Sequence, residues 1–185
     1  MRKLPRMFRD GPLSRRPPEE IRYGTGKCAL GRVLVASSDR GIVTIMVRDG
    51  QARLVNDLRA RFPKAALIHD EKSCAPEVKQ AIRYIGKPAG RFPLALDIRG
   101  TELQKRVWNE VRTIPFGATS SYSRIAAAIG APKAIRAVAG SCSRSWFAFA
   151  IPCHRVLHTG AIPGRRRGGR QYEWVEYEAK LLAKR

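Results

Sequence analysis

The chain has 185 residues, with 36 Lys+Arg against 15 Asp+Glu and a formal net charge of +21. This length suits one ordinary domain or two small ones, and an apolar fraction of 44% supports a packed core. The positive charge favours a polyanionic partner, with nucleic acid ahead of an acidic membrane surface. No apolar run could span a bilayer, and the N-terminal arginines precede no apolar signal region. We therefore expect a cytoplasmic protein without membrane contact.

The four cysteines lie far apart in the sequence, without the dense and even spacing of a disulfide framework. They indicate a reducing compartment in which each thiol is either buried or reactive. The cysteines are Cys28, Cys74, Cys142 and Cys153.

The first half of the chain is expected to be a flexible basic arm followed by an α/β unit. Residues 1–20 mix prolines with arginines and show no periodicity. Beyond Gly26 the chain alternates runs rich in Val, Ile and Leu with runs of helical spacing, and Ser38–Gly41 is typical of a hairpin turn. The pattern predicts strands over 29–37, 41–47 and 92–98 and helices over 51–62 and 74–85, within a unit spanning 21–98.

The second half, residues 99–185, is predicted to be mainly helical. Thr101 is a suitable N-cap for a helix over 101–113. Two shorter helices over 121–129 and 132–143 are joined by Gly130-Ala131, a pattern typical of a helix-turn-helix. A last helix is expected over 172–185.

The second of these short helices combines basic and small residues. Lys133, Arg136 and Arg144 could reach phosphates or base edges, and the small residues between them would allow a close approach to a nucleic acid. Close packing against another helix would need small residues as well, so both interpretations stay open.

The run Ile151–Val156 sets a cysteine beside a histidine, directly after the apolar residues 146–151. Pro152 fixes its own φ and removes a backbone donor, which favours a defined bend that presents Cys153 at the rim of a core. The alternative is that Cys153 is an ordinary buried cysteine. A zinc site is not expected, because Cys142, Cys153, His154 and His158 contain no CxxC pair and adjacent Cys153 and His154 can hardly share one ion.

These residues resemble the O6-alkylguanine-DNA alkyltransferases, and most closely the C-terminal half of the bacterial adaptive-response protein. The resemblance covers roughly residues 21–182 and is dense over 97–156. Its motifs are Ile98–Thr101, Val107-Trp108, Ile114-Pro115, Gly117, Ser121-Tyr122, Ile125-Ala126, Ile129-Gly130, Pro132–Ala134, Arg136–Val138 and Ile151–Val156.

The resemblance implies a ribonuclease-H-like α/β N-terminal subdomain followed by a mostly α, winged-helix-like subdomain with the helix-turn-helix. It also implies DNA repair by direct reversal. A monomer would flip O6-methylguanine, with O4-methylthymine as a second substrate, out of double-stranded DNA and move the methyl group irreversibly to Cys153. No metal or organic cofactor is expected, because the leaving group is the repaired base.

The resemblance also assigns roles to individual residues. His154 would take the thiol proton through a water, oriented by a glutamate of the last helix, as in other activated cysteines. Arg136 would fill the gap left by the flipped base, and Tyr122 would crowd the adjacent phosphate. Contacts to DNA are expected from Tyr122, Lys133, Ala134, Arg136, Gly140 and Ser141, and the base pocket from Tyr122, Cys142, Pro152 and Val156.

Three departures from the family pattern predict slow transfer. Ser145 stands where the family has an asparagine, and residues 163–170 are inserted where a compact loop over the base is expected. The expected glutamate position is occupied by Arg185, and Glu176 or Glu178 could replace it only through a shift of the helix register. The alternative function is an alkyltransferase-like protein that binds alkylated DNA without transfer. A transcription regulator ranks third.

Overall fold

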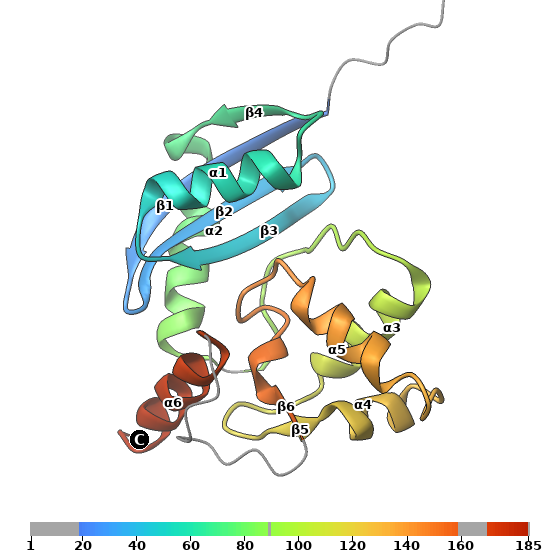
Figure 1. The fold of residues 1–185 in the computed structure, drawn as a ribbon. Helices are drawn as coiled ribbons and strands as arrows, with labels where there is room; N and C mark the ends of the chain where they lie inside the picture. The colour runs from blue at the N-terminus through green and yellow to red at the C-terminus, as the bar shows by residue number, and fades with distance from the viewer. Residues whose placement is uncertain (1–18, 89, 159–169, 185) are drawn as a thin grey trace, which may run out of the picture.

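A four-stranded sheet forms the first part of the computed structural model, which describes residues 19–88, 90–158 and 170–184 (Figure 1). Its strand order is β3-β2-β1-β4, and only the pair β1–β4 is parallel. The strands are β1 (Glu20–Cys28), β2 (Gly31–Ser38), β3 (Gly41–Arg48) and β4 (Ala66–His69).

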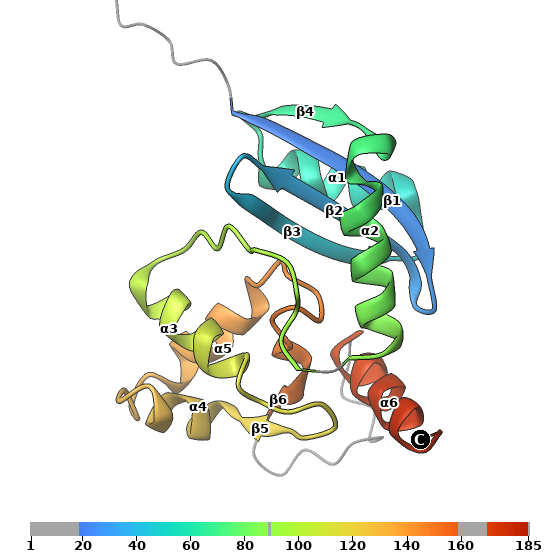
Figure 2. The same ribbon diagram turned by 180° about the vertical axis from the view of Figure 1, so that it is seen from behind.

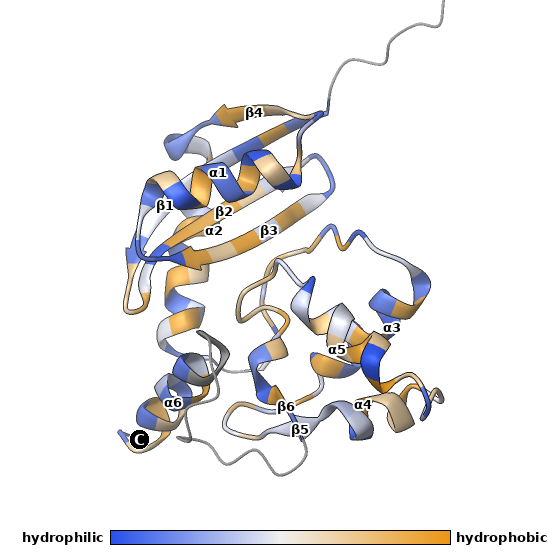
Figure 3. Cartoon of the chain, viewed as in Figure 1, coloured by the Kyte–Doolittle hydropathy of each residue, from blue (hydrophilic) through white to orange (hydrophobic). Residues whose placement is uncertain are grey.

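Helices cover both faces of this sheet, so its central strands are apolar on both sides. Helix α1 (Gln51–Arg61) lies on one face and α2 (Glu71–Gly86) on the other, as Figures 1 and 2 show from opposite sides. In β2, Leu34 belongs to the hydrophobic cluster that includes the buried residues of α1. Val33 and Val35 belong to the cluster that includes the buried residues of α2. The orange of β2 and β3 in Figure 3 reflects this two-sided burial.

The sequence predictions identified most of this first part but missed two strands. The strands over 29–37 and 41–47 and the helices over 51–62 and 74–85 are confirmed. β1 was missed because glycines interrupt its pattern. A Cβ at Gly24 would lie 2.9 Å from the Cys74 Cβ, and one at Gly26 would lie 2.8 Å from the Ile82 Cδ1, so both glycines allow α2 to approach closely. β4 was missed because it is only four residues long.

The predicted strand over 92–98 is wrong. This segment touches the edge of β3 at one isolated bridge, Ile42 with Leu96. Ile42 N–H donates to the Ala95 carbonyl at 3.0 Å and Asp97 N–H donates to the Ile42 carbonyl at 2.8 Å. The segment serves as the connection between the two parts of the molecule.

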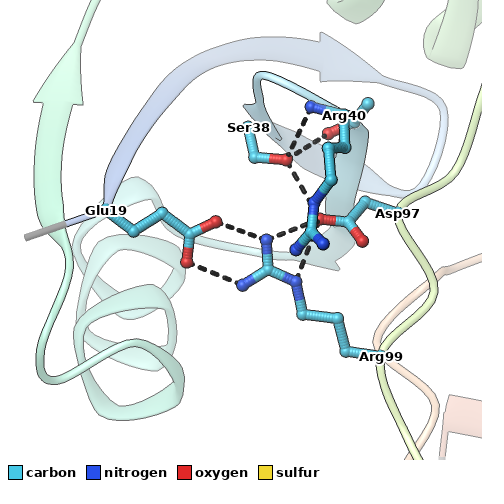
Figure 4. A network of polar contacts seen from close by, with 6 residues as sticks. Glu19, Ser38, Arg40, Asp97 and Arg99 are labelled. Carbon is cyan, nitrogen blue, oxygen red and sulfur yellow. Dashed lines mark hydrogen bonds and ion pairs between the residues drawn. The ribbon is translucent and has the colours of Figure 1, made fainter.

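A network of charged groups fixes this connection to the β2–β3 hairpin (Figure 4). The Arg99 guanidinium lies between the carboxylates of Glu19 and Asp97, donating to Glu19 Oε2 at 2.7 Å and to Asp97 Oδ2 at 3.0 Å. Asp97 also accepts from the Ser38 hydroxyl at 3.0 Å and pairs with Arg40 at 3.4 Å. The Arg99-Gly100-Thr101 motif is therefore held in place before the first helix of the second part.

The second part is built of short helices around a small parallel strand pair. Thr101 caps α3 in a reciprocal capping box with Gln104, which confirms the predicted N-cap. The Trp108 indole of α3 is 2% exposed and donates to the Ser141 carbonyl at 2.9 Å, which ties α3 to α5. The elements are α3 (Glu102–Val111), β5 (Ser120–Ser121), α4 (Tyr122–Ala128), α5 (Ile135–Ser143), the 3-10 turn η1 (Cys153–Arg155), β6 (Val156–Leu157) and α6 (Arg170–Leu182).

Helices α4 and α5 form the predicted helix-turn-helix, with one difference. Gly130 takes a left-handed φ of 69° in the turn, as its position requires. Helix α5 begins at Ile135, three residues later than predicted from Pro132, because the Ala134 N–H turns back to the Ala131 carbonyl at 2.9 Å. Lys133 and Ala134 therefore lie in the turn.

The loop between α5 and η1 lies along β3 and joins the two parts of the molecule. Ile45 N–H donates to the Trp146 carbonyl at 2.8 Å, and Ala148 N–H donates to the Ile45 carbonyl at 2.9 Å. The Thr44 hydroxyl donates to the same Trp146 carbonyl at 2.7 Å. The backbone leading to Cys153 is thus anchored on the sheet.

Within the part of the chain that the structure describes, no helix has both the length and the apolar character needed to cross a membrane.

Candidate active site

Cys153 begins the turn η1 and lies in the wall of a cavity of about 230 Å³. The buried Pro152 precedes it with φ −78° and ends the buried run, as the sequence predicted. The helix-turn-helix supplies the opposite wall, because Tyr122 opens α4 and Cys142 lies near the end of α5. The lining residues are Tyr122, Cys142, Ser143, Ser145, Cys153, His154 and Trp174.

His154 is buried and is oriented by a carboxylate. Its side chain is 2% exposed, and its Nε2 lies 3.0 Å from Oε1 of Glu178, whose side chain is 3% exposed. Since an ionised carboxylate only accepts hydrogen bonds, Nε2 carries the proton and donates it to Glu178. The neutral ring then keeps an acceptor lone pair on Nδ1, which makes no hydrogen bond within the described residues.

The expectation that His154 lacks a carboxylate partner is therefore wrong. Glu178 lies seven residues before Arg185, where the family pattern places the glutamate. Seven residues are about two helical turns, so both positions lie on the same face of a helix. Helix α6 packs against η1 and brings Glu178 to the histidine.

Arg155 is a site residue that the sequence reasoning missed. It is 4% exposed and forms a bidentate ion pair with Glu178, with Nε 2.9 Å from Oε2 and Nη2 2.7 Å from Oε1. Its Nη1 donates to the Ile114 carbonyl at 2.7 Å. The available signal was an arginine directly after Cys153 and His154, in a stretch whose neighbours are apolar.

The charges of this cluster set the protonation states of its members. Burial acts to raise the pKa of Glu178, but hydrogen bonds and charge from His154 and Arg155 outweigh it, and that pKa lies below its usual value. Burial lowers the pKa of His154 against the opposing effect of Glu178. The cluster at neutral pH is therefore an ionised Glu178, a cationic Arg155 and a neutral His154 that is able to accept a proton.

The thiol of Cys153 is kept in its protonated form at rest. Its hydrogen bond with the Cys142 thiol and its burial raise the pKa of Cys153 well above the ordinary value, while Ser145 acts in the opposite direction. A thiol in this environment needs a base at the moment of reaction. His154 is the adjacent base.

A second, smaller cavity of about 90 Å³, called the inner cavity below, also borders Cys153 and His154. Cys153, His154, Ser145 and Trp174 line both cavities and so form the partition between them. The far wall comes from Ile45–Arg48 of β3. This inner cavity has room for a few water molecules close to the Cys153 thiol and the His154 ring.

Trp174 of α6 is both a packing residue and part of the cavity wall. Its ring packs on Phe149 with centroids 4.8 Å apart and meets the edge of His154 at 5.6 Å. Trp174 therefore both lines the pocket and packs in the core. The side chains of the insertion 163–170 lie outside the described residues.

The residues predicted to contact DNA divide into exposed and buried ones. Arg136 on α5 and Lys133 in the preceding turn are exposed, whereas Ala134 and Gly140 are partly covered. Ser141 is 1% exposed, and its hydroxyl donates to the Ala137 carbonyl at 2.7 Å. Its side chain is therefore engaged within α5, and its contact with DNA stays a prediction.

Two residues predicted for the base pocket are not among the residues that line the outer cavity. Pro152 and Val156 are both buried, and Val156 pairs with Ser120 in the small sheet. Tyr122 and Cys142 line this cavity, and their contact with a base stays a prediction. His158 is exposed, and its ring meets the edge of Tyr122 at 5.0 Å. Residues 19–88, 90–158 and 170–184 contain no group of three or more His, Cys, Asp or Glu side chains able to hold a metal.

The comparisons with known proteins agree with this geometry. The family model for the DNA-binding domain of 6-O-methylguanine DNA methyltransferase matches residues 102–183. The Escherichia coli K12 bifunctional transcriptional activator/DNA repair enzyme Ada is 42% identical over 163 residues, which are 88% of this chain and 44% of that protein. A probable methylated-DNA–protein-cysteine methyltransferase of Acanthamoeba polyphaga mimivirus is 43% identical over 150 residues, 80% of this chain and 97% of that protein.

Solved structures show the same fold. The Mycobacterium tuberculosis OGT in complex with DNA superposes with a TM-score of 0.69 and 29% identity, covering 86% of this chain and 94% of that one. Fold and site together define a class of protein in which a partly buried cysteine lies beside a helix-turn-helix. The chain belongs to the methylated-DNA–protein-cysteine methyltransferase family. It spans less than half of the length of the Escherichia coli Ada protein.

Proposed function

We propose that this chain repairs O6-alkylguanine in double-stranded DNA by moving the alkyl group irreversibly to Cys153. The observation that carries the proposal is the series Cys153, His154 and Glu178. A partly buried thiol, a neutral imidazole and an ionised carboxylate follow one another beside a helix-turn-helix. An acidic partner at Nε2 and an acceptor at Nδ1 suit the histidine to take a proton from the thiol side.

The chemistry consists of one proton transfer and one displacement. The Cys153 proton passes to Nδ1 of His154, through a water that fits the inner cavity. The thiolate then attacks the alkyl carbon, an S–C bond forms, and the O6–C bond breaks with its electron pair on the guanine oxygen. The imidazolium is stabilised by Glu178. The expectation of slow transfer rested partly on a missing carboxylate, and Glu178 removes that reason.

The base reaches the thiol only outside the double helix, because the lesion carbon is covered within the base stack. Helix α5 presents Arg136 to solvent and ends at the cavity that holds Cys153. The net charge of +21 supplies non-specific attraction to phosphates. We assign Arg136 to the gap left by the flipped base and Tyr122, at the cavity mouth, to the adjacent phosphate.

The proposal is tested by incubating the protein with a duplex that contains O6-methylguanine and determining the mass of the Cys153 peptide. We expect a gain of one CH2 unit on Cys153, no gain in Cys153→Ala, and an unchanged gain on Cys153 in Cys142→Ala, which removes the neighbouring thiol. Binding of the lesion duplex without any mass gain would instead support the alternative of an alkylated-DNA binder.

Removing the Arg136 side chain is expected to weaken binding to the lesion duplex by roughly 1–3 kcal/mol. Arg83→Ala is the matched control, since Arg83 is an exposed arginine on α2 and its loss changes the net charge equally. Fluorescence anisotropy at fixed salt measures both affinities. Equal losses in the two variants would reduce Arg136 to a general electrostatic contact.

A further inference from the structure

Ser145 stands between the two cavities with a hydroxyl that the protein leaves without an ordinary partner. It follows α5 by two residues, and its backbone N–H donates to the Cys142 carbonyl at 3.2 Å. The hydroxyl oxygen is buried and makes no hydrogen bond of normal geometry within the described residues. A buried hydroxyl in that state costs free energy, so its presence calls for a reason.

The surroundings of Ser145 supply that reason. Ser145, Cys153 and His154 line the same inner cavity of about 90 Å³, and His154 Nδ1 is the other buried polar atom of this cavity wall without a hydrogen bond in the described chain. The Ser145 hydroxyl is also near enough to the Cys153 sulfur to act toward a lower pKa of that thiol. The Ser145 hydroxyl and His154 Nδ1, both without a hydrogen bond in the described chain, therefore belong to residues that line the same cavity as Cys153.

We propose that Ser145 is a positioning residue for the nucleophile: its hydroxyl donates a hydrogen bond to the Cys153 sulfur as the thiol loses its proton. The proton of Cys153 goes to His154, the Ser145 proton stays on its oxygen, and no bond of Ser145 breaks. The sulfur of a thiol is a weak acceptor, whereas the sulfur of a thiolate accepts strongly, so the hydrogen bond from Ser145 is made fully only in the reactive state. Such a donor is expected to lack a hydrogen-bond partner before the reaction, as the Ser145 hydroxyl does within the described residues.

Other ionisable groups also lie around the sulfur. Cys142 on α5 shares a hydrogen bond with Cys153 that raises its pKa. Tyr122 on α4 faces the outer cavity, and Arg48 on β3 faces the inner one. Glu178 on α6 lies behind His154, so its charge reaches the sulfur only through the imidazole.

The test uses iodoacetamide on the full chain without DNA, following alkylation of the Cys153 peptide by mass spectrometry as a function of pH. In Ser145→Ala we expect the midpoint of the pH profile about one unit higher and alkylation below it roughly tenfold slower, with an unchanged plateau at high pH. Ser145→Thr keeps a hydroxyl and should keep the wild-type midpoint. Thr113→Ala is the matched control, because its hydroxyl donates to the Glu110 carbonyl and its exposed side chain lines neither cavity.

The melting temperature separates this proposal from a merely structural role for Ser145. Under the proposal, Ser145→Ala deletes a buried hydroxyl that has no protein partner, so the melting temperature should equal or exceed that of the wild type. A wild-type midpoint in Ser145→Ala, or a lower melting temperature with a lower plateau, would overturn the proposal. The inference rests on the proposed function, but its assay contains no DNA, so the two can fail separately. A shifted midpoint without methyl transfer would contradict only the proposed function. Methyl transfer with an unshifted midpoint would contradict only the role of Ser145.

Discussion

Replacing Glu178 by alanine is expected to lower the free energy of unfolding by about 3–5 kcal/mol, because it leaves the Arg155 guanidinium buried without its counter-charge. It also removes the acceptor of His154 Nε2, so methyl transfer should slow strongly even where the protein remains folded. Glu176→Ala is the control, since Glu176 is exposed on the same helix. Urea unfolding and single-turnover transfer measure the two effects, and equal stability of the two variants would contradict the buried cluster.

The same cluster gives the stability a defined pH dependence. The pKa of Glu178 is lower in the folded chain than in the unfolded one, so its contribution is present above the unfolded value and is lost as pH falls through the folded value. The pKa of His154 is lowered too, so protonation of the unfolded state below about pH 6.5 adds to the loss. We expect Glu178→Gln to flatten the carboxylate part of this acid limb.

Truncating Trp108 to alanine is the second change with a large expected effect, a loss of about 3–5 kcal/mol in the free energy of unfolding. The ring is 2% exposed, and the substitution also leaves the Ser141 carbonyl of α5 without the indole donor. Because that contact fixes α5 on α3, affinity for DNA should fall together with the melting temperature.

Trp108→Phe separates the two contributions of this residue. It keeps most of the apolar volume and loses the N–H donor, so we expect a loss of about 1–3 kcal/mol. Thermal unfolding, with DNA binding measured well below the midpoint, checks both variants. A phenylalanine variant as unstable as the alanine variant would show that the hydrogen bond, rather than packing, holds α3 and α5 together.

Local patterns in the sequence predicted the elements whose signals are local. The Thr101 cap, the apolar spacing of α3 and the glycine turn at Gly130 depend on neighbours a few residues away. β1 could not be read in this way, since Gly24 and Gly26 are explained by the approach of α2, which is far away in the sequence.

The site shows the same division between local and distant information. Cys153 and His154 are adjacent in the sequence, and their motif predicted the nucleophile and the base. The carboxylate lies 24 residues after His154, on a helix that follows an insertion. A motif does not fix the register of such a helix, so the sequence left Glu176 and Glu178 as candidates, and the packing of α6 on η1 identifies Glu178.

The attachment of two loops to β3 has a further consequence for solubility. A sheet edge with unpaired N–H and C=O groups is a template for strands of other molecules. Residues 95–97 and 146–148 occupy backbone groups of β3 at Ile42 and Ile45, and the opposite edge of the described sheet is the four-residue β4. The loop that leads to Cys153 thus also shields the apolar strand β3 from self-association. A substitution that displaces this loop from β3 should therefore affect both the position of the nucleophile and the tendency to aggregate.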